Sequence, residues 1–300
     1  MTGIIFAIIT VLAWGAWLAP SQKVQFANPQ IKTMYVAFGN LLLATVVLFI
    51  AGAHQLTSSI FWLPFIGGII WAISGQFAFT ATSKLGMAKA FGTWAPLNIL
   101  MGLVWGIILW NEWSDASATT IIWVIASVVI LIAGIMFIVF SGSNNGKVAQ
   151  TSKETLIGFF GAFMAGILWG TYYVPSAYFA KDINVSAYIT AFPLAVGMFT
   201  GSFILALITK KTFALSSGAA YLRTLSTGLL WGIGNFSMLL MIGQIGQGKG
   251  ATIAQLCVVV NAVIGIWYFK EPAPKSRAAK LIMIGVVLAS IGGIILGNIK

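Results

Sequence analysis

Long apolar stretches alternate with short polar segments along the whole chain. The run 121–140, for example, carries no charge. About 18 apolar residues are enough to cross roughly 30 Å of hydrocarbon as a helix. The pattern predicts an all-α polytopic membrane protein of about ten helices. The expected ranges are 3–19, 33–52, 60–82, 87–110, 118–141, 156–179, 186–209, 222–244, 250–269 and 278–297.

Two halves of five helices are expected. The longest polar connection, 141–154, is rich in Ser, Gly and Asn and lies near the middle of the chain. We therefore expect a first five-helix unit over 1–141, a linker over 142–155 and a second unit over 156–300.

The halves repeat one another in sequence. The spacing W-G-x-x-x-x-P-S begins at Trp14 and again at Trp169, an offset of 155 positions. Five helices are an odd number, so two successive copies insert with opposite orientation, as in many secondary transporters. Matching prolines in the two copies, Pro20 and Pro175, are expected hinges. Three further ordered pairs keep offsets between 155 and 160: Trp71 with Trp231, Gln76 with Asn235, and Lys89 with Lys249.

Composition and charge support a membrane location. The chain is 59% hydrophobic and 7% charged, whereas soluble domains carry about 25% charged residues. The net charge of +11 does not indicate nucleic-acid binding, because the basic residues stand singly or in pairs beside apolar runs. Thirteen of the 16 Lys and Arg residues fall on the side of the 1–2, 3–4, 5–6, 7–8 and 9–10 connections. That side is expected to be cytoplasmic, with both termini outside.

Enzyme chemistry is not indicated. The chain has one histidine, His54, and one cysteine, Cys257, and no metal-ligand spacing or phosphate-binding loop. No cofactor is expected. The acids fall at helix ends or in loops, and none is near a predicted bilayer centre. A gating or coupling role, or simple helix capping, is expected for residues at the ends of helices: Lys89, Glu112, Lys249 and Glu271.

Polar and aromatic residues inside the spans are the candidates for solute binding. Unsatisfied polar groups in hydrocarbon are costly, so they face the bundle or a cavity. Uncharged amides both donate and accept hydrogen bonds, which suits hydroxyl-rich ligands. The alternative is that the amides join helices and the tryptophans anchor the chain at the membrane interface. The candidate substrate-binding residues are Trp14, Asn40, Gln76, Trp94, Asn98, Trp169, Tyr172, Tyr173, Asn235, Gln255 and Asn261.

Four stretches carry a resemblance to a known family. They are LAWGAWLAPSQKV, WAISGQFAFTATSKLGMAKAFG, WGIILWNEW and LLWGIGNFSMLLMIGQIGQGKG. With them the chain resembles the drug/metabolite transporter superfamily and, more narrowly, the bacterial glucose/ribose porter family of sugar uptake proteins. The resemblance implies uptake of a monosaccharide energised by the proton gradient.

The expected function is therefore secondary transport of a small polar solute by alternating access, with a sugar as substrate, the lipid bilayer as surroundings and protons as the coupling ion. The expected location is the bacterial inner, or plasma, membrane. Two alternatives stay open. One is an exporter or exchanger of amino acids, nucleosides or other metabolites; the other is a non-transporting receptor or membrane enzyme. The sequence does not indicate an oligomeric state.

Overall fold

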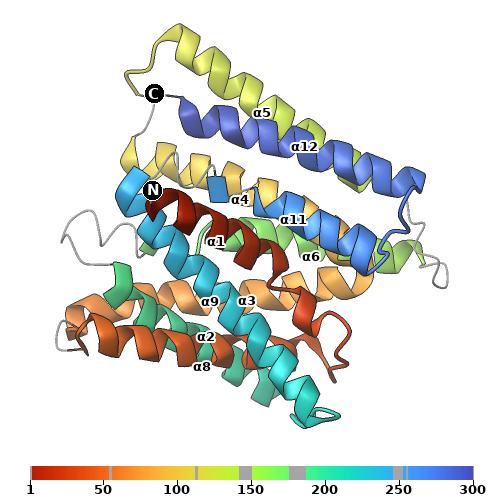
Figure 1. Cartoon of the computed structure of the whole chain (residues 1–300). Coiled ribbons are helices and arrows are strands. Elements are labelled where there is room, and N and C mark those ends of the chain that lie inside the picture. Colours follow the sequence, from red (N-terminus) through yellow and green to blue (C-terminus); the bar gives the residue numbers. More distant parts are fainter. Residues whose placement is uncertain are drawn as a thin grey trace.

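The computed structural model describes residues 2–53, 56–111, 114–141, 151–175, 187–245, 253–254 and 256–299. All of the regular elements within these ranges are helices (Figure 1). Their bounds are α1 (Thr2–Ala16), η1 (Ala19–Ser21), α2 (Pro29–Ala51), α3 (Ser58–Leu85), α4 (Met87–Trp110), α5 (Ala118–Val139), α6 (Ser152–Trp169), α8 (Ala187–Ile208), α9 (Gly218–Ile245), α11 (Cys257–Val263), η3 (Ile264–Tyr268) and α12 (Arg277–Asn298).

Within the described ranges, seven helical spans are long and apolar enough to cross a membrane. Their outer faces are apolar as well: on α5, for example, Ile122, Val129 and Met136 are exposed. A large apolar surface that points outward on many helices is stable only against lipid. The prediction of an all-α polytopic membrane protein is confirmed.

Capping residues set several helix starts. The Asn28 side chain accepts a hydrogen bond from Ile31 N, so α2 begins at Pro29 rather than near 33. Thr151 and Glu154 form a capping box, so α6 begins at Ser152 rather than at 156. The first turn of α6 therefore occupies the end of the segment expected to be linker.

Two helices end earlier than the sequence pattern predicts. The first helix ends at Ala16 and continues as the short 3-10 helix η1, which contains Pro20. The sixth ends at Trp169 rather than at 179; turns follow over 170–173, and residues 174 and 175 are helical again. Proline disfavours helical backbone in the residue before it and supplies no N–H.

The two halves are interleaved. Helix α1 packs against α9 and α11, α2 against α8 and α9, and α3 against α6 and α8. Most first-half helices thus find their main neighbours in the second half. Figure 1 shows this mixing as colours from both ends of the sequence side by side. Any solute site at the centre must be built by helices of both halves.

Pairs of glycines mark the closest of these contacts. Gly39 of α2 lies against Gly228 of α9, and Gly68 of α3 lies against Gly197 of α8. A Cβ atom on Gly228 would lie 3.0 Å from the Gly39 Cα, and one on Gly197 would lie 3.1 Å from the Gly68 Cα. Small residues allow this approach, which drives association in lipid through van der Waals contact.

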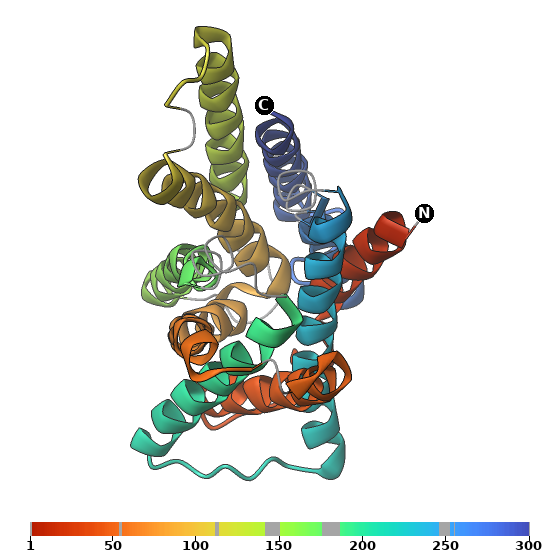
Figure 2. The ribbon, with the colours of Figure 1, turned by 90° about the vertical axis from the view of Figure 1, so that its left-hand side faces the viewer.

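Helices α5 and α12 stand together at one edge of the bundle. They pack against each other and contact the remainder mainly through α4 and α11. The view in Figure 2 shows this pair projecting away from the other helices. Both marked termini lie at the same end of the molecule (Figure 1). The central site is therefore built by the other helices.

Candidate functional site

A cluster of aromatic rings fills the place where helices of the two halves cross. Trp169 of α6 is its centre, with ring centroids 5.7 Å from Trp17, 5.8 Å from Trp71 and 5.3 Å from Trp94. Trp231 of α9 extends it, 5.3 Å from Trp71. Contacts of edges with faces suit the quadrupoles of aromatic rings. We call these five tryptophans the aromatic cluster.

The aromatic cluster contains two buried donors without an acceptor. The indole nitrogens of Trp71 and Trp169 have no hydrogen-bond partner among the described residues. Trp71 is fully buried and Trp169 is 6% exposed. Most buried polar groups in proteins are hydrogen-bonded, and each exception is a candidate for a ligand or water site.

The repeat counterpart of Trp169 behaves differently. Trp14 of α1 donates its indole N–H to the carbonyl oxygen of Trp231 at 3.1 Å. This bond joins α1 to α9. One indole of the repeated W-G motif is therefore used inside the protein, and the other is not.

Three of the candidate amides connect helices. Asn261 of α11 donates to Gly15 O at 3.1 Å, and Asn40 of α2 donates to the sulfur of Met198 at 3.3 Å. With its nitrogen facing the carbonyl groups, the Asn98 amide donates to Gly166 O at 2.7 Å. These contacts agree with the alternative in which amides hold the bundle together.

Other candidates lie at or beside the cluster. Tyr172 is buried, with its ring 6.1 Å from Trp231 and 6.0 Å from Tyr173. Gln76 lies five residues after Trp71 on α3, about 140° around the helix. Its nitrogen donates to Ala72 O, and its buried carbonyl oxygen has no partner in the described part of the chain. Asn235 is buried on α9.

Polar contacts close one end of the bundle around η1. The hydroxyl of Thr227 on α9 donates to Ser21 Oγ at 2.8 Å. The Gln22 amide donates to Glu271 Oε2 at 3.3 Å, which links the 1–2 connection to the 9–10 connection. Trp17, one turn before η1, belongs to the aromatic cluster. The segment with the expected hinge Pro20 thus lies between the cluster and this end.

Two buried lysines lie near the same end. The Lys32 ammonium is 3.5 Å from Ser21 O and lies 4.6 Å from the centre of the Phe79 ring. Lys89 of α4 lies over the Phe159 ring at 5.5 Å. Aromatic faces attract cations, and the effect grows when water is excluded. The two lysines thus lie against aromatic rings at the end of the bundle that contains η1.

Hollows in the described surface lie elsewhere. One, of about 390 Å³, runs along α1 past Ala7 and Val11 to Ile253, and the other, of about 400 Å³, lies by Trp123 and Asn298. Both face the outside of the bundle. At the centre, the rings of the aromatic cluster pack against one another. The described residues contain no group of three potential metal ligands.

Three expected site residues, Glu112, Lys249 and Gln255, lie outside the described residues. Sequence reasoning missed two features of the site. Trp17, in the turn that follows α1, belongs to the cluster, although it is absent from the candidate residues. Lys32 was counted only as a flanking charge, although its place four residues after the Asn28 cap puts it inside the helix.

The fold and this site define a polytopic α-helical membrane protein with a closed aromatic centre. The sequence profile of the sugar transport protein family matches residues 5–299. The chain belongs to that family, so it is a sugar transport protein by descent, and the resemblance to bacterial sugar uptake proteins is confirmed.

Relatives cover the chain from end to end. A protein of Lactiplantibacillus plantarum, described as a proposed sugar uptake protein, is 27% identical over 299 residues, 99% of each chain. A similarly described protein of Streptococcus agalactiae is 26% identical over 302 residues, covering 100% of this chain and 99% of the relative. A crystal structure with 18% identity has a TM-score of 0.65 and covers 99% of this chain and 97% of its own. That likeness shows the fold alone.

Proposed function

We propose that this chain takes up a monosaccharide, glucose- or ribose-like, across the plasma membrane by alternating access. The observation that carries the proposal is the aromatic cluster, built by α3, α4, α6, α9 and the turn after α1. Tryptophan combines an apolar face with a polar edge, so a set of such rings suits a sugar with apolar faces and hydroxyl groups.

Two inverted repeats over 1–141 and 156–300 supply the moving parts. The glycine contacts support this. The repeat offset takes Gly39 to Gly197 and Gly68 to Gly228, so the two contacts occupy equivalent places in the two repeats. Equivalent contacts on two sides of a centre allow one half to rock against the other. Pro20 and Pro175 are the proposed hinges, because both follow an early helix end.

The structure corresponds, in this proposal, to a state closed at the end that contains η1. Opening requires η1 to leave Thr227 and Glu271, and the rings around Trp169 to separate. Lys89 and Glu271 are the proposed gating residues. The substrate contacts proposed from the sequence are kept, and they are Trp14, Asn40, Gln76, Trp94, Asn98, Trp169, Tyr172, Tyr173, Asn235, Gln255 and Asn261.

Uptake by membrane vesicles tests the proposal. Vesicles that contain the protein are given radiolabelled glucose and ribose, with and without an inward proton gradient. We expect accumulation above that of empty vesicles, enhanced by the gradient. Equal uptake with and without the gradient would contradict proton coupling. Absence of sugar uptake together with efflux of an amino acid would replace the proposal by the exporter alternative.

A further inference from the structure

The two indole donors without an acceptor, on Trp71 and Trp169, lie in neighbouring rings. The ring centroids are 5.8 Å apart and the planes are inclined by 32°. An indole nitrogen donates one hydrogen bond and accepts none. A buried donor without a partner carries the cost of its lost hydration. An apolar ring system of the same shape would fill either place without that cost, so packing alone does not account for the two donors.

Indoles elsewhere in the bundle do find partners. Trp14 donates to the carbonyl oxygen of Trp231, and Trp105 donates to Thr171 Oγ1 at 3.0 Å. The contrast between Trp14 and its repeat counterpart Trp169 is the most informative. The repeat offers the same kind of helix crossing twice, yet only one indole is satisfied by the protein.

The helices around the two donors fix where they lie. Trp71 belongs to α3 and Trp169 to α6, and these helices also join through Ser74 Oγ, which donates to Ala165 O at 3.1 Å. Trp17 and Trp94 meet the Trp169 ring at 64° and 87°. In this closed arrangement, packing against these rings sets the orientation of the Trp169 indole.

We propose that Trp71 and Trp169 form a two-donor subsite that binds two oxygen atoms of a neutral monosaccharide. The inference rests on the proposed sugar uptake and names the protein groups that recognise the sugar. Hydroxyl oxygens and the ring oxygen of a pyranose both accept hydrogen bonds. When the rings separate to admit the sugar, its oxygens satisfy the two donors, and its apolar face lies against the neighbouring aromatic faces.

The subsite has a distinctive energetic signature. Removing an indole N–H deletes a bond made only in the complex, so sugar affinity falls while the free protein loses no internal hydrogen bond. A single neutral hydrogen bond corresponds to about a 3- to 10-fold change in affinity. A tryptophan with a purely structural role would show the opposite pattern, with lower stability and unchanged affinity.

The test compares Trp71→Phe and Trp169→Phe with Trp105→Phe in the full-length purified protein. Thermal unfolding is measured without ligand, and dissociation constants are measured for glucose and ribose. We expect each of the first two variants to bind the better sugar about 3- to 10-fold more weakly. In Trp105→Phe, we expect a lower unfolding temperature and unchanged affinity, because the hydrogen bond from Trp105 to Thr171 is lost in the free protein.

A second replacement keeps the shape of the side chain. Benzothienylalanine, incorporated at 71 or 169, has sulfur in place of the indole N–H and fills nearly the same volume. If a phenylalanine variant does not fold, the benzothienylalanine protein still tests whether the indole N–H contributes to sugar binding. Wild-type affinity in both benzothienylalanine proteins would overturn the two-donor subsite while leaving sugar uptake intact. Failure of the wild-type protein to bind any sugar would instead overturn the proposed function.

Deoxy sugars identify the oxygen that each indole meets. Affinities for the monodeoxy derivatives of the bound sugar are measured with the wild-type protein and with Trp169→Phe. We expect one derivative to bind weakly to the wild-type protein and no more weakly to the variant, because its bonding oxygen is already absent. Fully additive losses for every derivative, ring-oxygen analogues included, would show that Trp169 donates to no sugar oxygen.

Discussion

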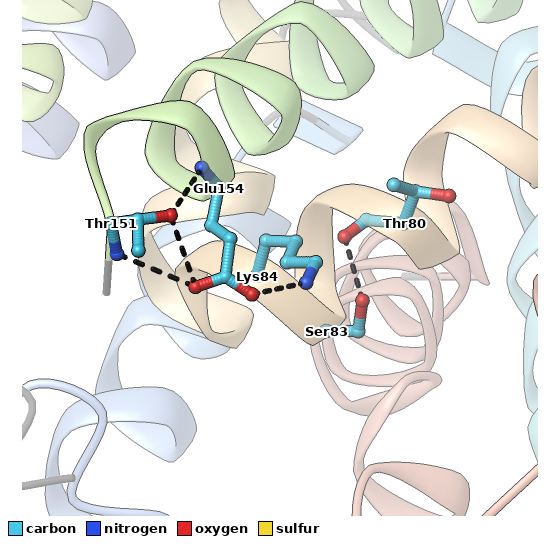
Figure 3. A network of polar contacts seen from close by, with 5 residues as sticks. All are labelled: Thr80, Ser83, Lys84, Thr151 and Glu154. Carbon is cyan, nitrogen blue, oxygen red and sulfur yellow. Dashed lines mark hydrogen bonds and ion pairs between the residues drawn. The ribbon is translucent and has the colours of Figure 1, made fainter. Parts of the chain in front are cut away.

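The ammonium of Lys84, in the last turn of α3, lies 2.7 Å from Oε1 of Glu154 in the first turn of α6 (Figure 3). The pair joins the two halves at one end of the bundle. Both side chains are part-exposed, 34% for Lys84 and 41% for Glu154. The same carboxylate accepts a hydrogen bond from Thr151 N at 3.4 Å and completes the capping box of α6.

The pair makes stability depend on pH in the acid range. The hydrogen bond from Lys84, followed by that from Thr151, holds the pKa of Glu154 below its ordinary value. A lowered carboxyl pKa stabilises the folded state above the unfolded pKa and loses that effect as the pH falls through the folded value. We expect Glu154→Gln to unfold at a slightly lower temperature at pH 7, and this difference to shrink as the pH falls through the lowered pKa of Glu154.

The control for this pair is Lys153→Gln, which changes one charge beside Glu154 without touching the ion pair. We expect it to follow the wild-type pH profile. Exchanging the two charges, in Lys84→Glu with Glu154→Lys, should restore part of the difference seen at pH 7. If the unfolding temperatures of the wild type and Glu154→Gln differ by the same amount at every pH, the role of Lys84 would be contradicted.

The glycine contacts give a prediction about stability. Gly228→Ala places a methyl group 3.0 Å from the Gly39 Cα and against the backbone of α2, so the helices must move apart. Overpacking of this kind costs about 1–3 kcal/mol. Gly218→Ala is the matched control on α9, because nothing lies within 4 Å of its Cβ position. Size-exclusion chromatography after heating measures the fraction of folded protein, and we expect Gly228→Ala to lose it at a lower temperature than Gly218→Ala. Equal unfolding curves for the two variants would contradict the close contact.

The closed end around η1 can be probed through Cys257, the single cysteine of the chain, which is 3% exposed on α11. Thr227→Val keeps the side-chain volume but removes the hydroxyl that bonds Ser21. We expect faster labelling of Cys257 by a small membrane-permeant maleimide, since η1 is released more often. Ser226→Ala, which removes a bond within α9 only, should label at the wild-type rate. Equal labelling rates in the wild type and both variants would show that the contact between η1 and Thr227 does not control access to Cys257.

Substrate binding should depend on Gln76 and Asn235, the candidate amides for which we describe no hydrogen bond to another helix. Gln76→Ala and Asn235→Ala are expected to weaken sugar binding by about tenfold, the size expected when a buried polar group in a complex loses its partner. Asn111→Gly is the comparison, because Asn111 ends α4 with a φ of 52°, which glycine adopts freely. Isothermal titration with the sugar taken up by vesicles measures the difference. If neither substitution changes the sugar affinity, Gln76 and Asn235 do not contact the substrate.

Local signals in the sequence predicted most of the helices but not all of their ends. Apolar runs gave the existence of the spans, because hydrocarbon admits only backbone that satisfies its own hydrogen bonds. Helix starts were displaced where a cap residue such as Asn28 or Thr151 competes with the apolar pattern. The end of α6 at Trp169 was missed, since the largely apolar sequence continues to Ala180, beyond the end of that helix.

The candidate site divides in the same way. The repeated motif singled out Trp14 and Trp169, because matching positions in two copies are visible in one chain. It did not distinguish the satisfied indole of Trp14 from the unpartnered one of Trp169, since that depends on which carbonyl oxygen lies beside each ring. Nor did it distinguish amides that join helices, such as Asn261, from amides that face the centre.

The sequence by itself determined that this protein is a helical bundle that spans a membrane, because apolar length is a property of the chain, and its internal repetition predicted two similar halves. Only the tertiary structure decided that the halves interleave, that Trp17 and Lys32 join the central region, and that two indole donors are left without partners. Those features arise from contacts between residues far apart in sequence, such as Gly39 with Gly228, and close packing fixes them through the shapes of both partners.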